Sequence, residues 1–406
     1  MKVLIITYFF PPLNSIASLR PYSWAKYLAQ QGIDVTVLTV KKYPFDNDLN
    51  LPIEGFKVVE IPIPKPIKII SLGKLINFLN QKFSLGIYYK MRIPDETVRW
   101  IKPSFNWAKN YYWDVIISTA MPYTTHEIAY KLKKNQNCKV WVADWRDLFS
   151  ENPIFKGLPI IKIIEKQKEK KFNQEANLIT TVSQGLKNYW TKTTTKPVEI
   201  IYNGFFEEDY KITNPNIYSQ NQKIIIFYSG SLYEDKFIEY FFEAIEELEK
   251  ENYPKTIEFQ LAGAYNIEKY LKNYNINYHY LGFLKREEVI NKLFQVDFLF
   301  FPLEKEKDLP NWKGILTGKI FEYLGINLYI PKPVLVVGKT YDQEKIEILQ
   351  KSGCCIFLEN KQSVKDFFIN YQNNKKFTVQ PNKEFISFFS RKNQAKILLE
   401  KIKNIL

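Results

Sequence analysis

Two charged side chains, Lys319 and Glu322, lie three residues apart in the segment GILTGKIFEYLGINLYIPKPVLVVG at 314–338. The segment opens with glycines, continues as an amphipathic helix and ends in an apolar strand, so both side chains are expected near a helix start. A lysine and a glutamate at this spacing can be an ordinary solvated pair. They can also bind a ligand, because a carboxylate accepts hydrogen bonds from a ribose diol and a lysine suits phosphates. The surrounding sequence decides between these interpretations.

A second candidate for phosphate binding is the segment YSGSLYEDK at 228–236, which follows an apolar strand. Gly230 allows a tight strand-to-helix turn, and Lys236 adds a positive charge near the helix start. Open α/β sheets bind ligands at the carboxyl ends of their strands, where both segments are expected to lie. Together they predict a nucleotide-diphosphate pocket formed by Gly230, Ser231, Lys236, Lys319 and Glu322. The chain has no G-x-G-x-x-G and no Walker lysine motif, which disfavours dinucleotide oxidoreductases and P-loop enzymes.

Polar turns also follow strands in the first half of the chain. In YFFPPLNSIASLRP, the small residues Asn14 and Ser15 let a ligand approach the backbone. Arg20 follows early in the helix, where it reaches a phosphate or carboxylate or else pairs with an acid of a neighbouring strand. The segment ADWRDLF ends a strand with Asp144 and Arg146, which either contact a substrate or brace a loop as a buried pair. These residues are candidates for an acceptor site or cleft.

Histidines and cysteines are too few for a metal centre of the usual kinds. The only histidines are His126 and His279, and the three cysteines are Cys138, Cys354 and Cys355. Their spacing gives neither a disulfide framework nor a zinc motif, so we expect no metal site and a reducing compartment. In STAMPYTTHE, His126 stands at a helix start, where it orients a substrate or merely caps the helix.

Strands and helices alternate along the chain, which is typical of doubly wound parallel sheets. A chain of 406 residues exceeds what one hydrophobic core usually supports. We therefore predict two Rossmann-like domains, 1–203 and 204–384, with the Asn-rich stretch 203–223 as the hinge. The run 385–406 is predicted as an amphipathic terminal helix. The expected strands of both halves are VLIITY, DVTVLTV, WDVIISTA, KVWVADW, LITTVS and VEIIYNG, then KIIIFYS, IEFQLAG, NYHYLGFL, DFLFFPL, PVLVVG and CCIFLEN.

The net charge of +14 is concentrated in the first half, where residues 1–190 hold 27 Lys and Arg against 15 Asp and Glu. Nucleic acid, anionic lipid, phosphorylated substrates or solubility alone could explain this excess. No nucleic-acid-binding module is recognisable, so we expect no nucleic-acid partner. Residues 57–109 interrupt the strand-helix rhythm with a basic amphipathic insert, which lies on an anionic membrane surface or covers the sheet as an ordinary helix.

The chain begins with a strand at Lys2, without a cationic leader or cleavage site. The apolar run VLIITYFFPPL is too short to span a bilayer and is interrupted by two prolines. We therefore expect a cytoplasmic protein, with peripheral attachment to the cytoplasmic face of a membrane through the basic insert.

Taken together, these segments resemble the retaining nucleotide-sugar glycosyltransferases of family four, which have the GT-B fold. The resemblance spans nearly the whole chain. It rests on YFFPP followed by Arg20, AKYLAQQGIDVTVLT, DVIISTAMPYTTHEIAYKLKK, VADWRDLF, LITTVSQGL, IYNGFFEEDY, YSGSLYEDK and LTGKIFEYLG. It implies two Rossmann-like domains facing each other across a cleft, with the acceptor on the first domain and the nucleotide-sugar on the second. It also implies that the terminal helix crosses back to the first domain.

Matched position by position, Gly230 and Lys236 correspond to the glycine and lysine of the family's diphosphate turn. Ser231 stands where that turn usually has arginine. Glu322 matches the second glutamate of the family's Glu-x7-Glu motif, which holds the ribose, while Gly314 occupies the place of the first glutamate. Lys319 is then a compensating positive charge near the phosphates.

The resemblance implies transfer of a sugar, with retention, from a nucleotide-diphosphate sugar to a hydroxyl of a saccharide or lipid-linked acceptor. Lys236 and Lys319 would stabilise the departing diphosphate, and His126 would orient the donor or acceptor. No essential metal or other cofactor is expected. Two alternatives remain open: a catalytically silent nucleotide-sugar-binding protein of the same fold, and a nucleotide-sugar epimerase.

Overall fold

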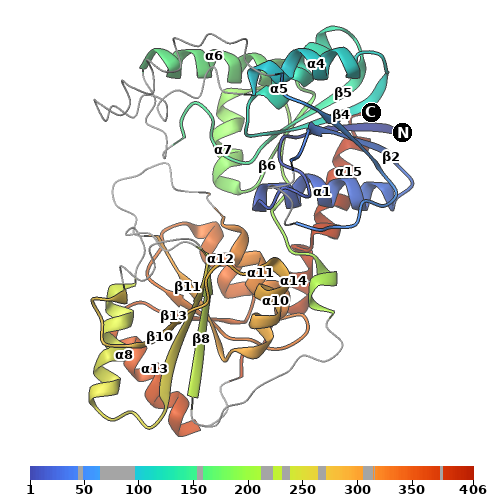
Figure 1. The fold of residues 1–406 in the computed structure, drawn as a ribbon. Coiled ribbons are helices and arrows are strands. Elements are labelled where there is room, and N and C mark those ends of the chain that lie inside the picture. The colour runs from blue at the N-terminus through green and yellow to red at the C-terminus, as the bar shows by residue number, and fades with distance from the viewer. Residues whose placement is uncertain are drawn as a thin grey trace, which may run out of the picture. The chain divides into compact units, whose positions relative to one another are not determined.

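The protein is described here from a computed structural model, which places residues 1–43, 49–64, 97–152, 159–211, 223–230, 238–263, 271–304, 314, 316–374 and 378–406. The chain divides into two compact units (Figure 1). The first unit contains Met1–Tyr202, Leu309–Ile315 and Gln394–Leu406, and the second contains Asn203–Asp308 and Leu316–Asn393.

The first unit is built on a seven-stranded sheet whose paired strands are all parallel. The order across the sheet is β3-β2-β1-β4-β5-β6-β7, so the direction of winding reverses between β1 and β4. Burial on both faces explains why these strands are rich in β-branched residues. The strands are β1 (Lys2–Ile6), β2 (Asp34–Val40), β3 (Lys57–Ile61), β4 (Trp113–Ala120), β5 (Cys138–Trp145), β6 (Leu178–Thr181) and β7 (Val198–Ile200).

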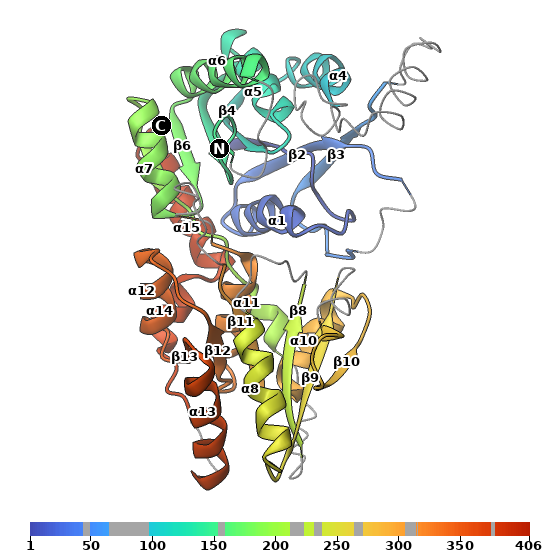
Figure 2. The same ribbon diagram turned by 90° about the vertical axis from the view of Figure 1, so that its left-hand side faces the viewer.

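Helices cover both faces of this sheet. Figures 1 and 2 show α4 and α5 on one face and α1 on the other. The core is dominated by tryptophans, five of which are fully buried in one cluster: Trp100, Trp113, Trp141, Trp145 and Trp190. The helices of this unit are α1 (Ile16–Ala29), α4 (Val98–Ala108), α5 (Thr124–Lys134), α6 (Pro159–Glu175), α7 (Gln184–Thr193) and most of α15 (Arg391–Lys403).

The second unit repeats the design with a six-stranded parallel sheet of order β10-β9-β8-β11-β12-β13. Its core is rich in phenylalanine rather than tryptophan, with Phe241, Phe242, Phe259 and Phe300 packed around the central strands. The strands are β8 (Lys223–Ser229), β9 (Thr256–Ala262), β10 (Asn277–Tyr280), β11 (Phe298–Pro302), β12 (Val334–Val337) and β13 (Cys355–Leu358).

The helices of the second unit also flank its sheet. α8 and α13 pack against each other, and α10 and α11 lie at the sheet's other face (Figure 1). They are η2 (Glu207–Tyr210), α8 (Glu239–Lys250), α10 (Arg286–Gln295), α11 (Gly318–Ile326), α12 (Gln343–Lys351), α13 (Lys361–Asn374) and α14 (Lys383–Phe388). The prediction of two doubly wound, Rossmann-like α/β units is confirmed.

Two expectations about individual segments need correction. The strand-helix rhythm is not interrupted at residue 57, because β3 pairs in parallel with β2 from Lys57 to Ile61. The central part of the predicted insert, 65–96, lies outside the described residues. The terminal run is also not one helix. α14 ends before Ser390, which forms an isolated bridge with Phe205, and the Arg391 amide donates to the Phe205 carbonyl. This pairing satisfies backbone groups that a continuous helix would use internally.

Beyond this break, α15 joins the first unit from Gln394 onward. Gln394 Oε1 accepts a hydrogen bond from the Tyr202 amide (2.8 Å), and Lys401 Nζ lies 3.0 Å from Glu199 Oε1. None of the helices in the described ranges is both long and apolar enough to cross a bilayer.

Candidate functional site

The carboxyl edge of the second sheet has the strand arrangement that creates a ligand site in doubly wound folds. β8 lies between β9 and β11, and the chain moves outward from β8 to β10 before returning to β11. The connections after β8 and β11 therefore leave in opposite directions. The turn at Gly230 and the start of α11 both lie at this edge.

Gly230 and Gly263 end the neighbouring strands β8 and β9 with positive φ angles of +120° and +123°. A Cβ atom added to Gly263 would lie 2.8 Å from the Cα and N atoms of Gly230. Only glycine combines this conformation with so close a contact between two backbones. The edge thus presents bare backbone, which a ligand can approach closely.

The ammonium group of Lys319 lies directly against this backbone. A Cβ atom on Gly230 would be 2.4 Å from Lys319 Nζ, so the lysine occupies the space that a side chain would otherwise fill. Lys319 Nζ also donates to the Tyr228 hydroxyl at 3.0 Å and lies 4.6 Å from the centre of that ring. Lys319 is in the first turn of α11, and this first turn contains no acidic residue. The lysine and the helix N-terminus therefore concentrate positive charge at one point.

α11 is fixed to its surroundings by close packing and by two hydrogen bonds that involve tyrosine hydroxyls. A Cβ atom on Gly325 would lie 2.7 Å from Phe205 Cγ, so this glycine lets the helix approach the segment before η2. The Tyr210 hydroxyl donates to the Glu322 carbonyl at 2.8 Å, and the Tyr323 hydroxyl accepts from the Ser229 amide at 3.4 Å. These contacts hold Lys319 in register with the end of β8.

Glu322 belongs to a partly exposed ion-pair network. Its Oε1 atom accepts from Arg286 Nη1 at 2.7 Å, and Arg286 Nη2 lies 2.5 Å from Asp209 Oδ2. Burial opposes the charge on Arg286, but Glu322 and Asp209 outweigh burial and raise the pKa of the guanidinium above its ordinary value. The second oxygen of Glu322, Oε2, accepts no hydrogen bond from the described residues, so it can accept one from a ligand hydroxyl.

Two predicted members of this site cannot be placed beside Lys319. Ser231 and Lys236 lie outside the described residues. Gly314 has a φ angle of +96° and lies in the first unit, where an added Cβ atom would be 2.8 Å from Ser183 Oγ. A glutamate could not take this backbone position without displacing α7.

Arg20 and Asp144 pair with each other in the interior of the first unit, which favours the buried-pair alternative over an acceptor cleft. Arg20 Nη2 lies 2.8 Å from Asp144 Oδ1, and Arg20 Nε lies 3.1 Å from Oδ2. Thr119 and Thr180 each donate to the same carboxylate at 2.8 Å. Burial raises the pKa of Asp144, but Arg20 and the hydroxyl donors outweigh burial and lower it below its ordinary value. The pair connects five segments, namely α1, β4, β5, β6 and the chain after β7, because Arg20 Nη1 also donates to the Ile201 carbonyl at 2.6 Å.

The remaining candidates of the first unit differ in accessibility. The Arg146 guanidinium is hydrogen-bonded to backbone carbonyls, because it donates to that of Ala120 at 2.7 Å and to that of Met121 at 3.1 Å. Ser15 caps α1 by accepting from the Ala17 amide at 3.2 Å. Asn14 is exposed in the turn after β1. Of the predicted cleft residues, Asn14 is the one whose side chain faces solvent.

His126 is fully buried and packs into the core, and Tyr123 rather than His126 holds the N-cap position of α5, so the described contacts show a core residue instead of a helix cap. Its ring packs edge-on against Trp145 with centroids 4.2 Å apart, and Nδ1 lies 2.7 Å from Ser118 Oγ. Trp141 Nε1 donates to the Ser118 hydroxyl at 2.8 Å, so this hydroxyl can donate its own hydrogen bond to His126 Nδ1. Burial lowers the pKa of His126 to about 3, which keeps the ring neutral.

Sequence reasoning missed Arg286 and Gly263 as members of the site in the second unit. Gly263 carried a signal, because the motif LAG repeats the strand-then-glycine pattern of YSG at Gly230. Arg286 looked like one of several charges at a helix start, and only the packing of α10 brings it to Glu322. Among the described residues, no group of three or more His, Cys, Asp and Glu side chains is placed to hold a metal ion.

Comparison with solved structures places this architecture among GT-B proteins. Sucrose-phosphate synthase from Thermosynechococcus elongatus superposes with a TM-score of 0.68 at 12% identity, covering 100% of this chain and 99% of that one. An E. coli trehalose-6-phosphate synthase bound with UDP-2-fluoro glucose gives a TM-score of 0.62 at 11% identity, with 100% of both chains covered. A putative UDP-N-acetylglucosamine 2-epimerase from Listeria monocytogenes gives 0.54 at 15% identity, covering 99% and 96%.

These likenesses establish the GT-B fold expected from the sequence. No protein-family model matches the chain, and no curated protein matches it in sequence. At identities of 11–15%, these likenesses define the fold of the chain and not its activity.

Proposed function

We propose that this protein is a glycosyltransferase that moves a sugar, with retention, from a nucleotide-diphosphate sugar to a hydroxyl acceptor. The observation that carries the proposal is the position of Lys319 against Gly230 at the carboxyl edge of β8. A fixed cation beside bare backbone and a helix N-terminus suits a diphosphate. The full-length likeness to a synthase solved with UDP-2-fluoro glucose supports the same class of donor.

In the proposed reaction, the bond between the sugar carbon and the diphosphate oxygen breaks while the acceptor oxygen bonds to that carbon from the same face. The acceptor proton passes to the departing phosphate oxygen. Negative charge grows on the diphosphate as the bond breaks, so Lys319 and the α11 N-terminus stabilise the transition state more than the bound donor. We propose that Lys236 adds a second charge and that no metal is essential.

Glu322 is proposed to hold the ribose through Oε2 while Arg286 holds Oε1. Arg286 remains charged throughout the working pH range and orients Glu322 through their hydrogen bond at 2.7 Å. This arrangement makes Arg286 a positioning residue for the donor.

A donor screen tests the proposal directly. A panel of nucleotide-diphosphate sugars is tested by thermal shift and by product analysis, first alone and then with saccharide and lipid-linked acceptors. We expect one donor to stabilise the protein and to release its nucleoside diphosphate faster when the acceptor is present. A donor that binds without turnover would indicate a silent binding protein, and an altered donor sugar without acceptor would indicate an epimerase.

The acceptor is proposed to be a growing saccharide, free or lipid-linked, in polysaccharide assembly at the cytoplasmic face of a membrane. The basic excess of the first half supports this location. So does α6, where Ile160 and Ile163 are 67% and 56% exposed beside Lys162 and Lys166. Exposed apolar side chains beside lysines favour an anionic bilayer surface.

Liposome flotation at low and high salt tests this location. We expect binding to anionic vesicles at low salt, weaker binding to neutral vesicles, and loss of binding in the double variant Ile160→Asp and Ile163→Asp. Equal failure to float in every mixture, with full activity on a soluble acceptor, would reject the membrane part and leave the transferase part standing.

A further inference from the structure

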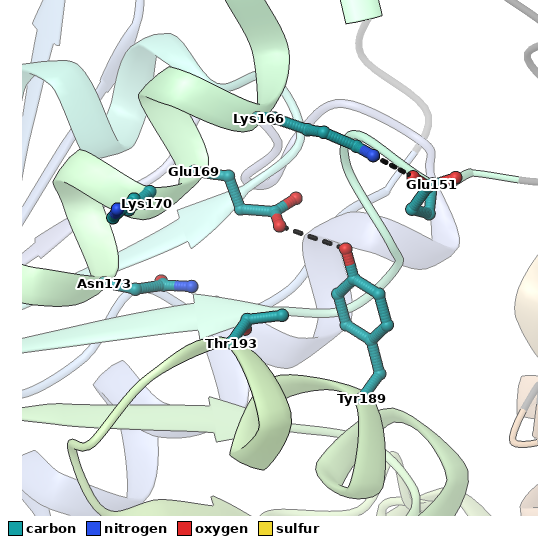
Figure 3. A pocket seen from close by; sticks show the side chains of 7 residues that line it. All are labelled: Glu151, Lys166, Glu169, Lys170, Asn173, Tyr189 and Thr193. Atoms are coloured by element: carbon teal, nitrogen blue, oxygen red, sulfur yellow. Dashed lines mark hydrogen bonds and ion pairs between the residues drawn. The ribbon is translucent and has the colours of Figure 1, made fainter. Parts of the chain in front are cut away.

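A pocket of about 360 Å³ lies between α6 and α7 in the first unit, apart from every residue discussed for donor binding (Figure 3). This volume is within the range of small-molecule sites. Glu151, in the connection after β5, forms one part of its wall, and the other lining residues come from four positions of α6 and two of α7. The lining residues are Glu151, Lys166, Glu169, Lys170, Asn173, Tyr189 and Thr193.

Asn173 supplies the observation that points to a ligand. Its side chain is buried, and its Oδ1 atom accepts from Trp145 Nε1 at 2.8 Å. The indole nitrogen can only donate, so it fixes the amide with the oxygen toward Trp145. The amide nitrogen Nδ2 then points into the pocket, as Figure 3 shows, and it has no hydrogen-bond partner among the described residues. A buried donor without a partner costs free energy unless a ligand or water supplies an acceptor.

Acceptors come from Glu169, one turn before Asn173 on α6, and from α7 on the facing wall. Glu169 is also buried, and its carboxylate accepts from the Tyr189 hydroxyl at 3.1 Å and from the Ser150 amide at 3.0 Å. Each carboxylate oxygen has a second lone pair that can accept from a ligand hydroxyl. Burial raises the pKa of Glu169 above its ordinary value. Thr193 donates to the Trp190 carbonyl at 2.9 Å, which leaves its oxygen free to accept.

The charges at the rim are of both signs, so they favour neither a strongly anionic nor a strongly cationic ligand. Lys166 lies 2.7 Å from Glu151, and Lys170 is exposed beside the mouth of the pocket. An anion would meet Glu169 and Glu151, whereas a cation would meet Lys166 and Lys170. The pocket offers a donor at Asn173 and acceptors at Glu169 and Thr193, which match a ligand whose hydroxyls each donate and accept. A neutral sugar ring has this chemistry.

We propose that this pocket binds one neutral monosaccharide unit. The further assignment of that unit to the acceptor saccharide rests on the proposed function, but the binding of the sugar does not. The Tyr189 and Thr193 oxygens and the Asn173 amide contact its hydroxyls, and the pocket gives the first unit a sugar site separate from the donor site.

Saturation-transfer NMR on the full chain tests the proposal, because it detects weak binding. The probes are neutral methyl glycosides of glucose, galactose, mannose and N-acetylglucosamine, with glucuronate and glucosamine as charged comparisons. We expect at least one neutral glycoside to bind, with affinity about three- to ten-fold lower in Thr193→Val and Tyr189→Phe, the effect of losing one neutral hydrogen bond. Thr191→Val is the matched control, because Thr191 is exposed on the same helix outside the pocket.

Lys170→Ala and its control Lys171→Ala both replace exposed side chains, so neither substitution disturbs the interior of the first unit. Absence of binding by every neutral glycoside, preference for a charged sugar, or unchanged affinity in the pocket variants would overturn the proposal. Nucleotide affinity is measured on the same samples. Sugar binding without nucleotide binding would reject the donor site alone, and nucleotide binding without sugar binding would reject the pocket alone.

Discussion

Each unit builds an ion-pair network around an arginine, but the two networks differ in exposure. In the first unit, Arg20 and Asp144 are 2% and 0% exposed, and both carboxylate oxygens are shared between the guanidinium and threonine hydroxyls. In the second unit, Arg286, Glu322 and Asp209 are 19%, 15% and 21% exposed. The first network is closed and braces the fold, whereas the second leaves a carboxylate oxygen available. We therefore propose that the same residue types serve structure in one unit and ligand binding in the other.

The largest expected effect is on the closed network. Asp144→Ala leaves Arg20 as an unpaired buried charge, so we expect the free energy of unfolding to fall by about 3–5 kcal/mol. Asp209→Ala in the open network should cost only about 1 kcal/mol, because Arg286 keeps Glu322 and reaches water. Chemical denaturation of both variants measures the difference. Equal losses would show that exposure does not distinguish the two networks.

A smaller effect is expected for Glu322, on ligand binding rather than on folding. Glu322→Ala should weaken nucleoside diphosphate binding by about ten-fold, because a hydrogen bond between a charged acceptor and the ribose is lost. Calorimetry measures this affinity, and Glu322→Gln serves as the size-matched variant that retains an acceptor. Unchanged affinity in Glu322→Ala would make this network structural as well.

A third comparison uses the two histidines, one in each unit, and its effect on stability appears only as the pH falls below about 6.5. The unfolded state takes up a proton on His126 below about pH 6.5, whereas burial lowers the folded-state pKa to about 3. Stability should therefore fall as the pH drops from about 6.5 toward 3, by up to about 1.4 kcal/mol per pH unit. His126→Gln should have a shallower pH dependence than the wild type.

His279→Gln is the matched control for that measurement, because His279 is exposed on β10. Denaturant unfolding at several pH values compares the three proteins. Identical slopes for the wild type and His126→Gln would contradict the buried, neutral assignment of His126.

Much of the fold could be predicted because buried β-branched runs encode parallel strands. The segment predicted at 34–40 is β2, and the segment predicted at 113–120 is β4, without change of boundary. The break between α14 and α15 could not be predicted, because it depends on Phe205, which lies far away in the sequence. Local helix periodicity contains no information about such a partner.

The site could be predicted only in part, for the same reason. The rule that ligands bind at strand carboxyl ends brought Gly230 and Lys319 to one edge, where the structure has them in contact. It also selected Arg20 and Asp144, because the sequence does not tell whether polar residues at a strand end face a ligand or each other. His126 followed two threonines at a helix start, and all three are buried. Because all three side chains are polar, the sequence did not indicate that this face of α5 packs into the core.

The central claim is that Lys319 and the bare backbone at Gly230 bind a diphosphate. The most direct test is calorimetric titration of the wild type, Lys319→Met and Lys339→Met with uridine, guanosine, adenosine and cytidine diphosphates. Lys339 is the matched control, because it forms an exposed ion pair with Glu359 in the same unit. We predict that one diphosphate binds the wild type and Lys339→Met equally, and that Lys319→Met binds it about 10- to 100-fold more weakly. Equal affinity in all three proteins would contradict the account.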